Sequence, residues 1–303
     1  SNITNASVEV SSSNGLASML EMAESGEAYT CPEKPFVITL TEDIKFSFDV
    51  GNSTGTAPEN IIIDLNGHTL TLGPGVGSVG TTSNGIRVLA YSKLTLKNGT
   101  VVCSDIIGDN IKTAIANYGE LVLEDVSVKS GALTMYTINN RGKLTLLGKT
   151  TVENGQVQQN DYEPFDYVAI TNDPYTLYYI NDAVIDCDSD DVTVGNVQIE
   201  TYGTKGGEIK LNISSGSFGE FTEPESSGTV AVVGNISGGL FKSNVSEYCV
   251  DGLESRENAD GSYSIYKERI EQTGFSFEDK NPVDQWVAEK YTNIASGGEG
   301  TGA

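Results

Sequence analysis

The sequence predicts an all-β fold, a single-stranded parallel β-helix in which successive coils stack short strands into parallel sheets. Three observations support this fold class: a strand pattern returns along most of the chain, Gly and Asn corners separate its copies, and amphipathic helical stretches are scarce. The 303 residues include 34 glycines, which suits many tight corners. A β-sandwich is the alternative, although sandwich strands recur every roughly 8 to 12 residues and need not resemble one another.

The repeat is clearest over residues 60–72, where two short β segments flank a polar corner at Asn66-Gly67. Leu70 and Leu72 alternate with threonine, which is the period of a strand with one buried face. Eight or nine such coils, at roughly 4.8 Å each, would make a rod about 40 Å long. The first apolar residues of the repeated units are at positions 70, 94, 121, 144, 177, 209, 230 and 263.

Asparagines at the corners of the coils have an expected structural role. Asn117, Asn139 and Asn154 lie at or near corners, and asparagine tolerates the left-handed backbone conformation that corners need. We expect their side-chain amides to bridge successive coils by hydrogen bonds.

The solenoid is expected over residues 27–266, with a helix over 14–26 and a polar, flexible arm over 1–13. Asn14 would cap the helix, which would shield the open N-terminal end of the solenoid from water and from edge pairing. The apolar face of this helix consists of Leu16, Met19, Leu20 and Ala23.

The C-terminal tail over residues 267–303 departs from the repeat and ends in a Gly-rich segment. A short helix is expected over residues 282–291, which include the single tryptophan, Trp286. This helix would either cap the last coil or dock on another subunit.

The charge of the chain limits its partners. Lys and Arg total 18 against 42 Asp and Glu, a formal net charge of −24. Binding to nucleic acid or to an anionic membrane surface requires a clustered basic face, so we expect neither partner and no membrane insertion. The acidity is explained by solubility or by binding of a divalent cation or basic partner.

Four cysteines are spread along the sequence, at positions 31, 103, 187 and 249. With no Cys-x-x-Cys pair and a single histidine, a zinc site is not expected. Cys103 and Cys187 each follow apolar strand residues, which favours buried free thiols, with two disulfides as the alternative.

An aromatic, Pro-containing segment between residues 156 and 179 interrupts the repeat. Long inserted loops on a solenoid commonly form its binding face, and aromatic rings with acidic neighbours can stack on sugars and accept hydroxyl hydrogen bonds. The alternative is that these rings only fold the loop onto the coil. The candidate ligand-binding residues are Tyr162, Phe165, Tyr167, Tyr175, Tyr178, Tyr179, Asp161 and Asp166.

The densest carboxylate run is a candidate metal site. It contains Asp186, Asp188, Asp190 and Asp191, and carboxylates at alternating positions are typical of Ca²⁺ loops. It is not an EF-hand, because the sixth position lacks glycine and Val197 stands at the twelfth. A weak surface Ca²⁺ site and a solvated turn remain the alternatives, and no other cofactor is expected.

Two segments resemble a known group of proteins. Residues 238–248, followed by Asp260-Gly261-Ser262-Tyr263-Ser264-Ile265, resemble the closing segment of pectate-lyase-like right-handed β-helix proteins encoded by gut Firmicutes and their phages. The segment Ile63-Asp64-Leu65-Asn66-Gly67-His68-Thr69-Leu70 is similar to a coil of the same group. The resemblance covers roughly residues 14–266 and implies a right-handed coil and a surface or virion component.

These observations predict a non-catalytic extracellular rod that presents loops for binding polysaccharide or host-surface glycan. It would be a secreted or surface adhesin of a bacterium, or a phage head or tail appendage that contacts capsid or tail proteins or self-associates as a trimer. The alternative is a polysaccharide lyase or glycoside hydrolase. Against catalysis, no catalytic motif of polygalacturonase-like enzymes is present, and fold resemblance alone says nothing of activity.

Overall fold

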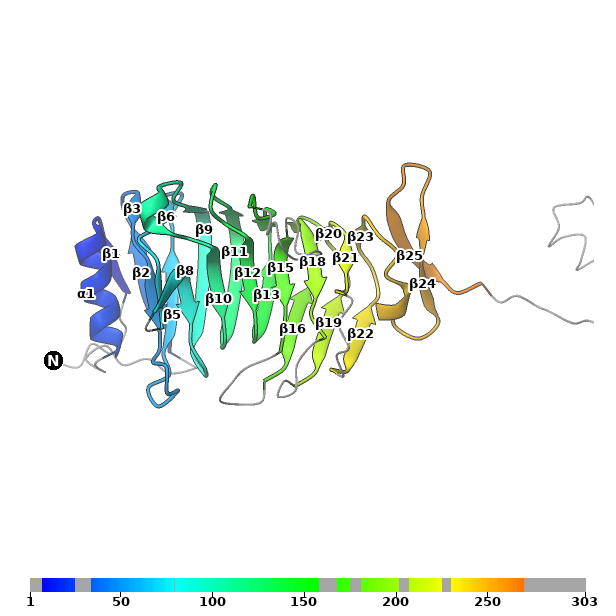
Figure 1. The fold of residues 1–303 in the computed structure, drawn as a ribbon, viewed down its shortest axis with the longest axis horizontal. Coiled ribbons are helices and arrows are strands. Elements are labelled where there is room, and N and C mark those ends of the chain that lie inside the picture. Colours follow the sequence, from blue (N-terminus) through cyan, green and yellow to red (C-terminus); the bar gives the residue numbers. More distant parts are fainter. Residues whose placement is uncertain are drawn as a thin grey trace, which may run out of the picture. The chain divides into compact units, whose positions relative to one another are not determined.

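The computed structural model describes residues 7–24, 34–78, 80–157, 168–174, 181–201, 207–224 and 230–269. The described residues up to Lys267 form a parallel β-solenoid followed by a C-terminal antiparallel hairpin (Figure 1). The predicted all-β parallel β-helix is therefore confirmed.

Each complete turn contributes three strands, and each strand pairs in parallel with its equivalents in the neighbouring turns. Column A contains β2 (Phe36–Leu40), β5 (Asn60–Asp64), the first halves of β9 (Lys93–Cys103) and β11 (Glu120–Lys129), β13 (Lys143–Leu147), β16 (Ala183–Cys187), β19 (Ile209–Ile213) and β22 (Val232–Ile236). Column B contains β3 (Ile44–Lys45), β6 (Thr69–Leu72), the second halves of β9 and β11, β14 (Thr151–Val152), β17 (Thr193–Val194), β20 (Ser217–Phe218) and β23 (Leu240–Phe241).

Column C is a separate sheet on the third side. It contains β4 (Phe48–Val50), β8 (Thr81–Val88), β10 (Thr113–Asn117), β12 (Tyr136–Asn140), β15 (Val168–Asn172), β18 (Asn196–Ile199) and β21 (Phe221–Thr222). Its seven parallel strands define seven complete turns in the described part of the chain. A short strand, β7 (Val76–Ser78), pairs antiparallel with β8, and a 3-10 turn, η1 (Ile107–Asp109), precedes β10.

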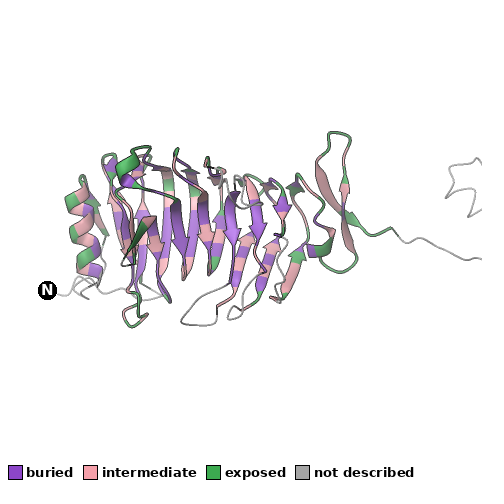
Figure 2. Ribbon diagram, in the orientation of Figure 1, coloured by how far each residue is buried: buried purple, intermediate pink, exposed green. Residues whose placement is uncertain are grey.

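The core is a set of inward stacks, because in strands such as β2, β13 and β19 alternate residues are buried and face the interior (Figure 2). In column A the register aligns Ile61, Leu94, Leu121, Leu144, Ile185 and Leu211 in successive turns, and all six are fully buried. In column C the equivalent inward stack runs from Phe48 through Ile86, Ile115, Ile138, Ile170 and Val197 to Phe221.

The register corrects parts of the predicted repeat. Leu70 lies in column B and pairs with Val101, whereas Leu94 lies in column A and pairs with Ile61. The unit assigned at Tyr263 is not a coil, because β25 (Tyr263–Lys267) runs antiparallel to its neighbours. The unit at Leu177 lies outside the described residues. Seven complete turns and a two-strand eighth turn therefore replace the eight or nine expected.

The N-terminal end is closed by a strand and a helix. β1 (Ser7–Val10) pairs in parallel with β2, so residues 7–10 are not the flexible arm that we expected. Helix α1 (Ser13–Glu24) follows, and the Gly15 amide donates to Ser12 Oγ at 3.1 Å, which makes Ser12 rather than Asn14 its N-terminal cap. The predicted apolar face packs on the solenoid, with Leu16, Leu20 and Ala23 buried and Met19 partly buried.

The C-terminal end is closed by irregular chain and a hairpin. A 3-10 turn, η2 (Ser246–Tyr248), is followed by β24 (Leu253–Glu257) and β25, which pair antiparallel. Phe218 and Phe241 stack with ring centroids 5.5 Å apart, and Tyr248 is buried with its ring centroid 6.3 Å from that of Phe221. The helix expected over 282–291 lies outside the described residues.

A ladder of inward asparagines links the corner between columns C and A. Asn117 Nδ2 donates to Asn140 Oδ1 at 2.9 Å, and Asn140 Nδ2 donates to Asn172 Oδ1 at 2.7 Å. The prediction for Asn117 is confirmed, but the next member is Asn140 and not Asn139, which faces the other side of β12. Asn154 also bridges turns, because its Oδ1 accepts from the Asn196 amide at 2.6 Å.

The described cysteines are free thiols. Cys103 and Cys187 are buried, at 2 % and 3 % exposure, and Cys249 is half-buried. Burial raises the pKa of both Cys103 and Cys187 to about 11. They lie in columns B and A, respectively, so they do not stack on each other. Cys31 lies outside the described residues.

Candidate functional site

The aromatic segment that the sequence analysis selected for ligand binding lies outside the described residues. This applies to all of its members, Asp161, Tyr162, Phe165, Asp166, Tyr167, Tyr175, Tyr178 and Tyr179. The chain nevertheless enters β15 directly from Tyr167 and leaves it through Asp173 and Pro174 towards Tyr175. The two aromatic stretches therefore connect to opposite ends of one strand of column C, and the outer face of that column is where a site can be built from described residues.

A continuous row of outward side chains runs along column C. It arises because the residue between two inward positions of a strand must face outward, and because the register aligns that residue in every turn. We call it the outer row; its members are Asp49, Arg87, Ala116, Asn139, Thr171, Gln198 and Thr222.

The middle of the outer row has unsatisfied hydrogen-bonding capacity. Four buried side-chain atoms have no hydrogen-bond partner among the described residues: Asn139 Oδ1, Thr171 Oγ1, and both Oε1 and Nε2 of Gln198. Gln198 is fully buried and Thr171 is 8 % exposed. Leaving a buried donor or acceptor unpaired costs about 1–3 kcal/mol, and native proteins do so rarely. In three consecutive turns, therefore, hydrogen-bonding capacity remains that only groups outside the described residues can complete.

A second row of polar side chains lies beside the outer row, at the residue that follows each strand of column C. Its members are Tyr118, Arg141, Asp173 and Glu200, and the backbone amide of each donates to the preceding turn at 2.7–3.0 Å. Arg141 Nη2 lies 3.3 Å from Asp173 Oδ2, and the Arg141 guanidinium lies 6.0 Å from the centre of the Tyr118 ring. This row contributes charge and an aromatic ring to the same face.

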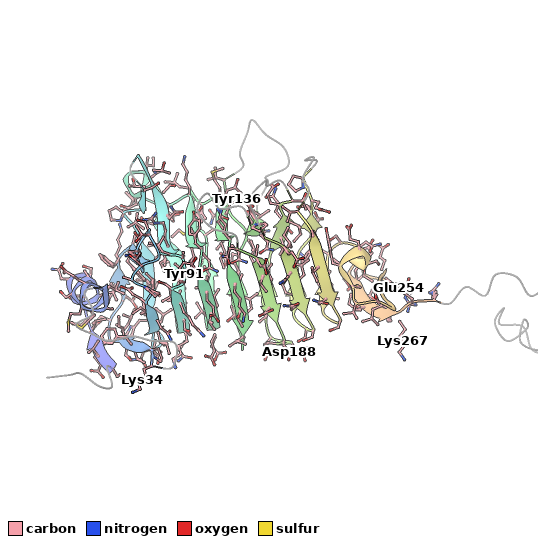
Figure 3. The ribbon with its side chains drawn as sticks, turned by 90° about the horizontal axis from the view of Figure 1, so that it is seen from below. Lys34, Tyr91, Tyr136, Asp188, Glu254 and Lys267 are labelled. Carbon is pink, nitrogen blue, oxygen red and sulfur yellow. The ribbon has the colours of Figure 1, made fainter. Side chains whose placement is uncertain are left out.

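Tyr136, at the start of β12, is half-buried and lies within electrostatic reach of Glu200 in the second row. Burial raises the pKa of its phenol, and the negative charge of Glu200 raises it further. The phenol therefore keeps its proton at neutral pH and can both donate and accept a hydrogen bond. Figure 3 shows Tyr136 and Asp188 on opposite sides of the solenoid, so this face is remote from the predicted metal site.

The carboxylates of the predicted metal site have separate partners. Asp186 accepts from Asn212 Nδ2 at 2.7 Å and lies 3.6 Å from Lys143 Nζ, whereas Asp188 accepts from the Ser214 hydroxyl. Asp188, Asp190 and Asp191 are exposed at the turn between columns A and B. In the described part of the chain, no three or more His, Cys, Asp or Glu side chains are grouped to hold a metal ion. The Ca²⁺ site stays a prediction.

Comparison with known proteins identified no matching family model, no matching curated protein and no matching solved structure. The parallel β-solenoid agrees with the expected β-helix fold, and the resemblance to pectate-lyase-like proteins stays a prediction. No helix among the described residues is long and apolar enough to cross a membrane.

Sequence reasoning missed the outer row because its members are not periodic. Asn139, Thr171 and Gln198 are separated by 32 and 27 residues and share no residue type. A usable signal was present nonetheless: each lies one residue after an aligned inward residue, as Asn139 follows Ile138. Alignment of the inward residues would have identified the row.

Proposed function

We propose that this protein is a non-catalytic rod that binds a glycan along the outer face of column C. The observation that carries the proposal is the run of unpaired buried polar atoms at Asn139, Thr171 and Gln198. A glycan presents hydroxyl groups that donate and accept hydrogen bonds at short intervals along a chain. Such a chain, lying parallel to the solenoid axis, would meet one side chain of the outer row per turn, at intervals of roughly 4.8 Å.

Aromatic residues support the same assignment. Tyr118 lies on this face, Tyr136 is within electrostatic reach of Glu200 in the second row, and the predicted ligand-binding aromatics connect in sequence to both ends of β15. Aromatic rings provide apolar faces on which sugar rings stack, while neighbouring polar groups fix the orientation. In the same proposal the protein acts outside the cell, as a surface adhesin or a phage appendage, where a net charge of −24 keeps copies apart.

The test is retention of the full chain on immobilised plant, mucin and bacterial polysaccharides. Gln198→Met keeps an unbranched side chain of similar length and removes both unpaired atoms, so the fold should keep its stability or gain about 1 kcal/mol. Retention should fall at least tenfold. The control is Asn212→Ala, which removes a paired amide on the opposite column and should leave retention unchanged. Equal retention by all three proteins would refute the assignment of this face.

Glycoside hydrolysis or lyase activity is the second candidate. The observation in its favour is that Asp173 and Glu200 occupy adjacent turns beside Arg141, and two neighbouring carboxylates are the usual requirement for a glycosidase. Conversion of the same polysaccharides to new reducing or unsaturated ends, lost in Glu200→Gln, would establish this reading in place of the first.

A further inference from the structure

A partly open cavity of about 520 Å³ lies between α1 and the first two turns. Its walls come from Ala17 and Leu20 of α1, Phe46 and Ser47 before β4, and the first two members of the outer row, Asp49 and Arg87. A volume of this size falls within the range of small-molecule sites. The cavity is therefore a site to assess separately from the long face of column C.

The polar wall of the cavity is an arginine–aspartate pair in which some guanidinium N–H groups are not bonded to the aspartate. Arg87 Nε donates to Asp49 Oδ1 at 2.7 Å and Arg87 Nη2 donates to Asp49 Oδ2 at 2.5 Å. These bonds raise the pKa of Arg87, so the guanidinium stays charged. A guanidinium has five N–H groups, and the bonds to Asp49 use two of them. The remaining donors of Arg87 and the free lone pairs of Asp49 lie side by side.

The inner wall of the cavity combines an aromatic surface with a lone hydroxyl. Phe46 and Phe48 stack with ring centroids 6.0 Å apart and an angle of 16° between their planes. Ser47 is 7 % exposed, and its hydroxyl has no hydrogen-bond partner among the described residues. A buried hydroxyl without a partner is unfavourable by itself, which points to a group that completes it.

We propose that this cavity binds one ring of a neutral polyhydroxylated molecule, such as a monosaccharide unit. The carboxylate of Asp49 accepts from one hydroxyl while the guanidinium of Arg87 donates to its neighbour, an arrangement that matches two adjacent hydroxyl groups on a ring. The phenylalanine rings face the apolar C–H surface of the same ring. Three carboxylates line the cavity, those of Glu21, Asp49 and Glu59, together with the guanidinium of Arg87. The carboxylates disfavour an anion, and Arg87 disfavours a cation placed directly beside it.

The proposal goes beyond glycan binding along column C. It uses α1 and the N-terminal end of the outer row, away from Asn139, Thr171 and Gln198, and it stands if those three residues bind nothing. If both sites act, the cavity would hold a terminal unit or a side branch, because it is closed on one side by α1.

The experiment is saturation-transfer NMR and calorimetric titration of the full chain with glucose, galactose, mannose, N-acetylglucosamine and myo-inositol. At least one should bind saturably. Ser47→Ala, which removes only the unpaired hydroxyl, should weaken binding about three- to tenfold without loss of stability. Arg87→Lys cannot form the fork and should weaken binding at least tenfold. The control is Arg256→Lys, which alters an arginine–glutamate pair in the C-terminal hairpin.

Absence of saturable binding to every member of the panel would overturn the proposal. So would binding that neither Ser47→Ala nor Arg87→Lys weakens, because the sugar would then occupy another part of the surface. Tighter binding of an alkylammonium ion or of inorganic phosphate than of any sugar would contradict the neutral ligand class. Thermal unfolding of each variant shows that it is folded, and Ser47→Ala decides the outcome if Arg87→Lys does not fold.

Discussion

Asn139 and Asn140 are consecutive residues of β12, yet their side chains have opposite hydrogen bonding. Asn140 faces the interior, where it accepts from Asn117, donates to Asn172 at 2.7 Å and donates to the Val184 carbonyl at 3.0 Å. Asn139 faces outward in the same strand, and its Oδ1 has no partner among the described residues. Two asparagine side chains one residue apart thus differ: the Asn140 amide is hydrogen-bonded within the solenoid, whereas the Asn139 amide oxygen is not.

The difference separates structural from functional use of polar groups. The inner ladder links turns through bonds that the chain itself completes, so it needs nothing from outside. The outer row is buried but incomplete over three turns. Outward position alone does not explain the missing hydrogen bonds. In an outward row on column A, Asn235 donates to Asn212 at 3.0 Å, and Asn212 donates to Asp186 at 2.7 Å.

The sharpest test of this contrast exchanges each asparagine of β12 for alanine. Asn140→Ala should lower the free energy of unfolding by about 2–4 kcal/mol, because it leaves Asn117, Asn172 and the Val184 carbonyl with buried unpaired groups. Asn139→Ala should change it by less than about 0.5 kcal/mol. Urea unfolding measures both values. Equal losses would mean that the outer amide is as well satisfied as the inner one.

The second test compares inward and outward positions in β16, where Asp186 faces outward and Cys187 inward. Thiolate is the reactive form, and a pKa of about 11 instead of 9.0 lowers its population at pH 8 about a hundredfold. Cys187 and Cys103 should therefore react with iodoacetamide at least a hundredfold slower than the same thiols in urea. Peptide mass mapping measures the alkylation rate of each cysteine. Alkylation of Cys187 in the folded protein as fast as in urea would contradict its inward position.

The smallest expected effect is the loss of folding stability at acidic pH. The inner asparagine ladder contains no titratable group, so this loss must come from carboxylates elsewhere in the fold. Lys45 and the Ser104 hydroxyl hold the pKa of Asp109 below its ordinary value of 3.8, and Lys210 does the same for Asp182. A carboxyl whose pKa is lower in the folded state stabilises the fold above the unfolded value, and this contribution disappears as pH falls through the folded pKa.

Stability should therefore decline below about pH 4, and Asp109→Asn should flatten that decline while Asn140→Ala leaves its slope unchanged. The melting temperature of each variant between pH 2 and 7 measures this pH dependence of stability. An unchanged slope in Asp109→Asn would show that this carboxyl does not contribute.

The fold was predictable because its signal is local. Leu94, Leu121 and Leu144 alternate with polar residues in short strands, and the similarity between these units indicates stacking. One error arises from the strand period of two, where a shift of one residue reverses the face that a side chain occupies. It placed the corner ladder at Asn139 instead of Asn140. The outer row required an alignment of the inward residues across turns whose lengths differ, and the pattern within a single turn does not supply that alignment.

The most direct test of the account is to incubate the full chain with the polysaccharide panel and to measure retention and product release together, with and without Ca²⁺. We expect retention on at least one polymer with no new reducing or unsaturated ends. Release of such ends would contradict the non-catalytic assignment and would identify Asp173 and Glu200 as the residues to test. Absence of retention on every polymer would contradict glycan binding by the outer face of column C.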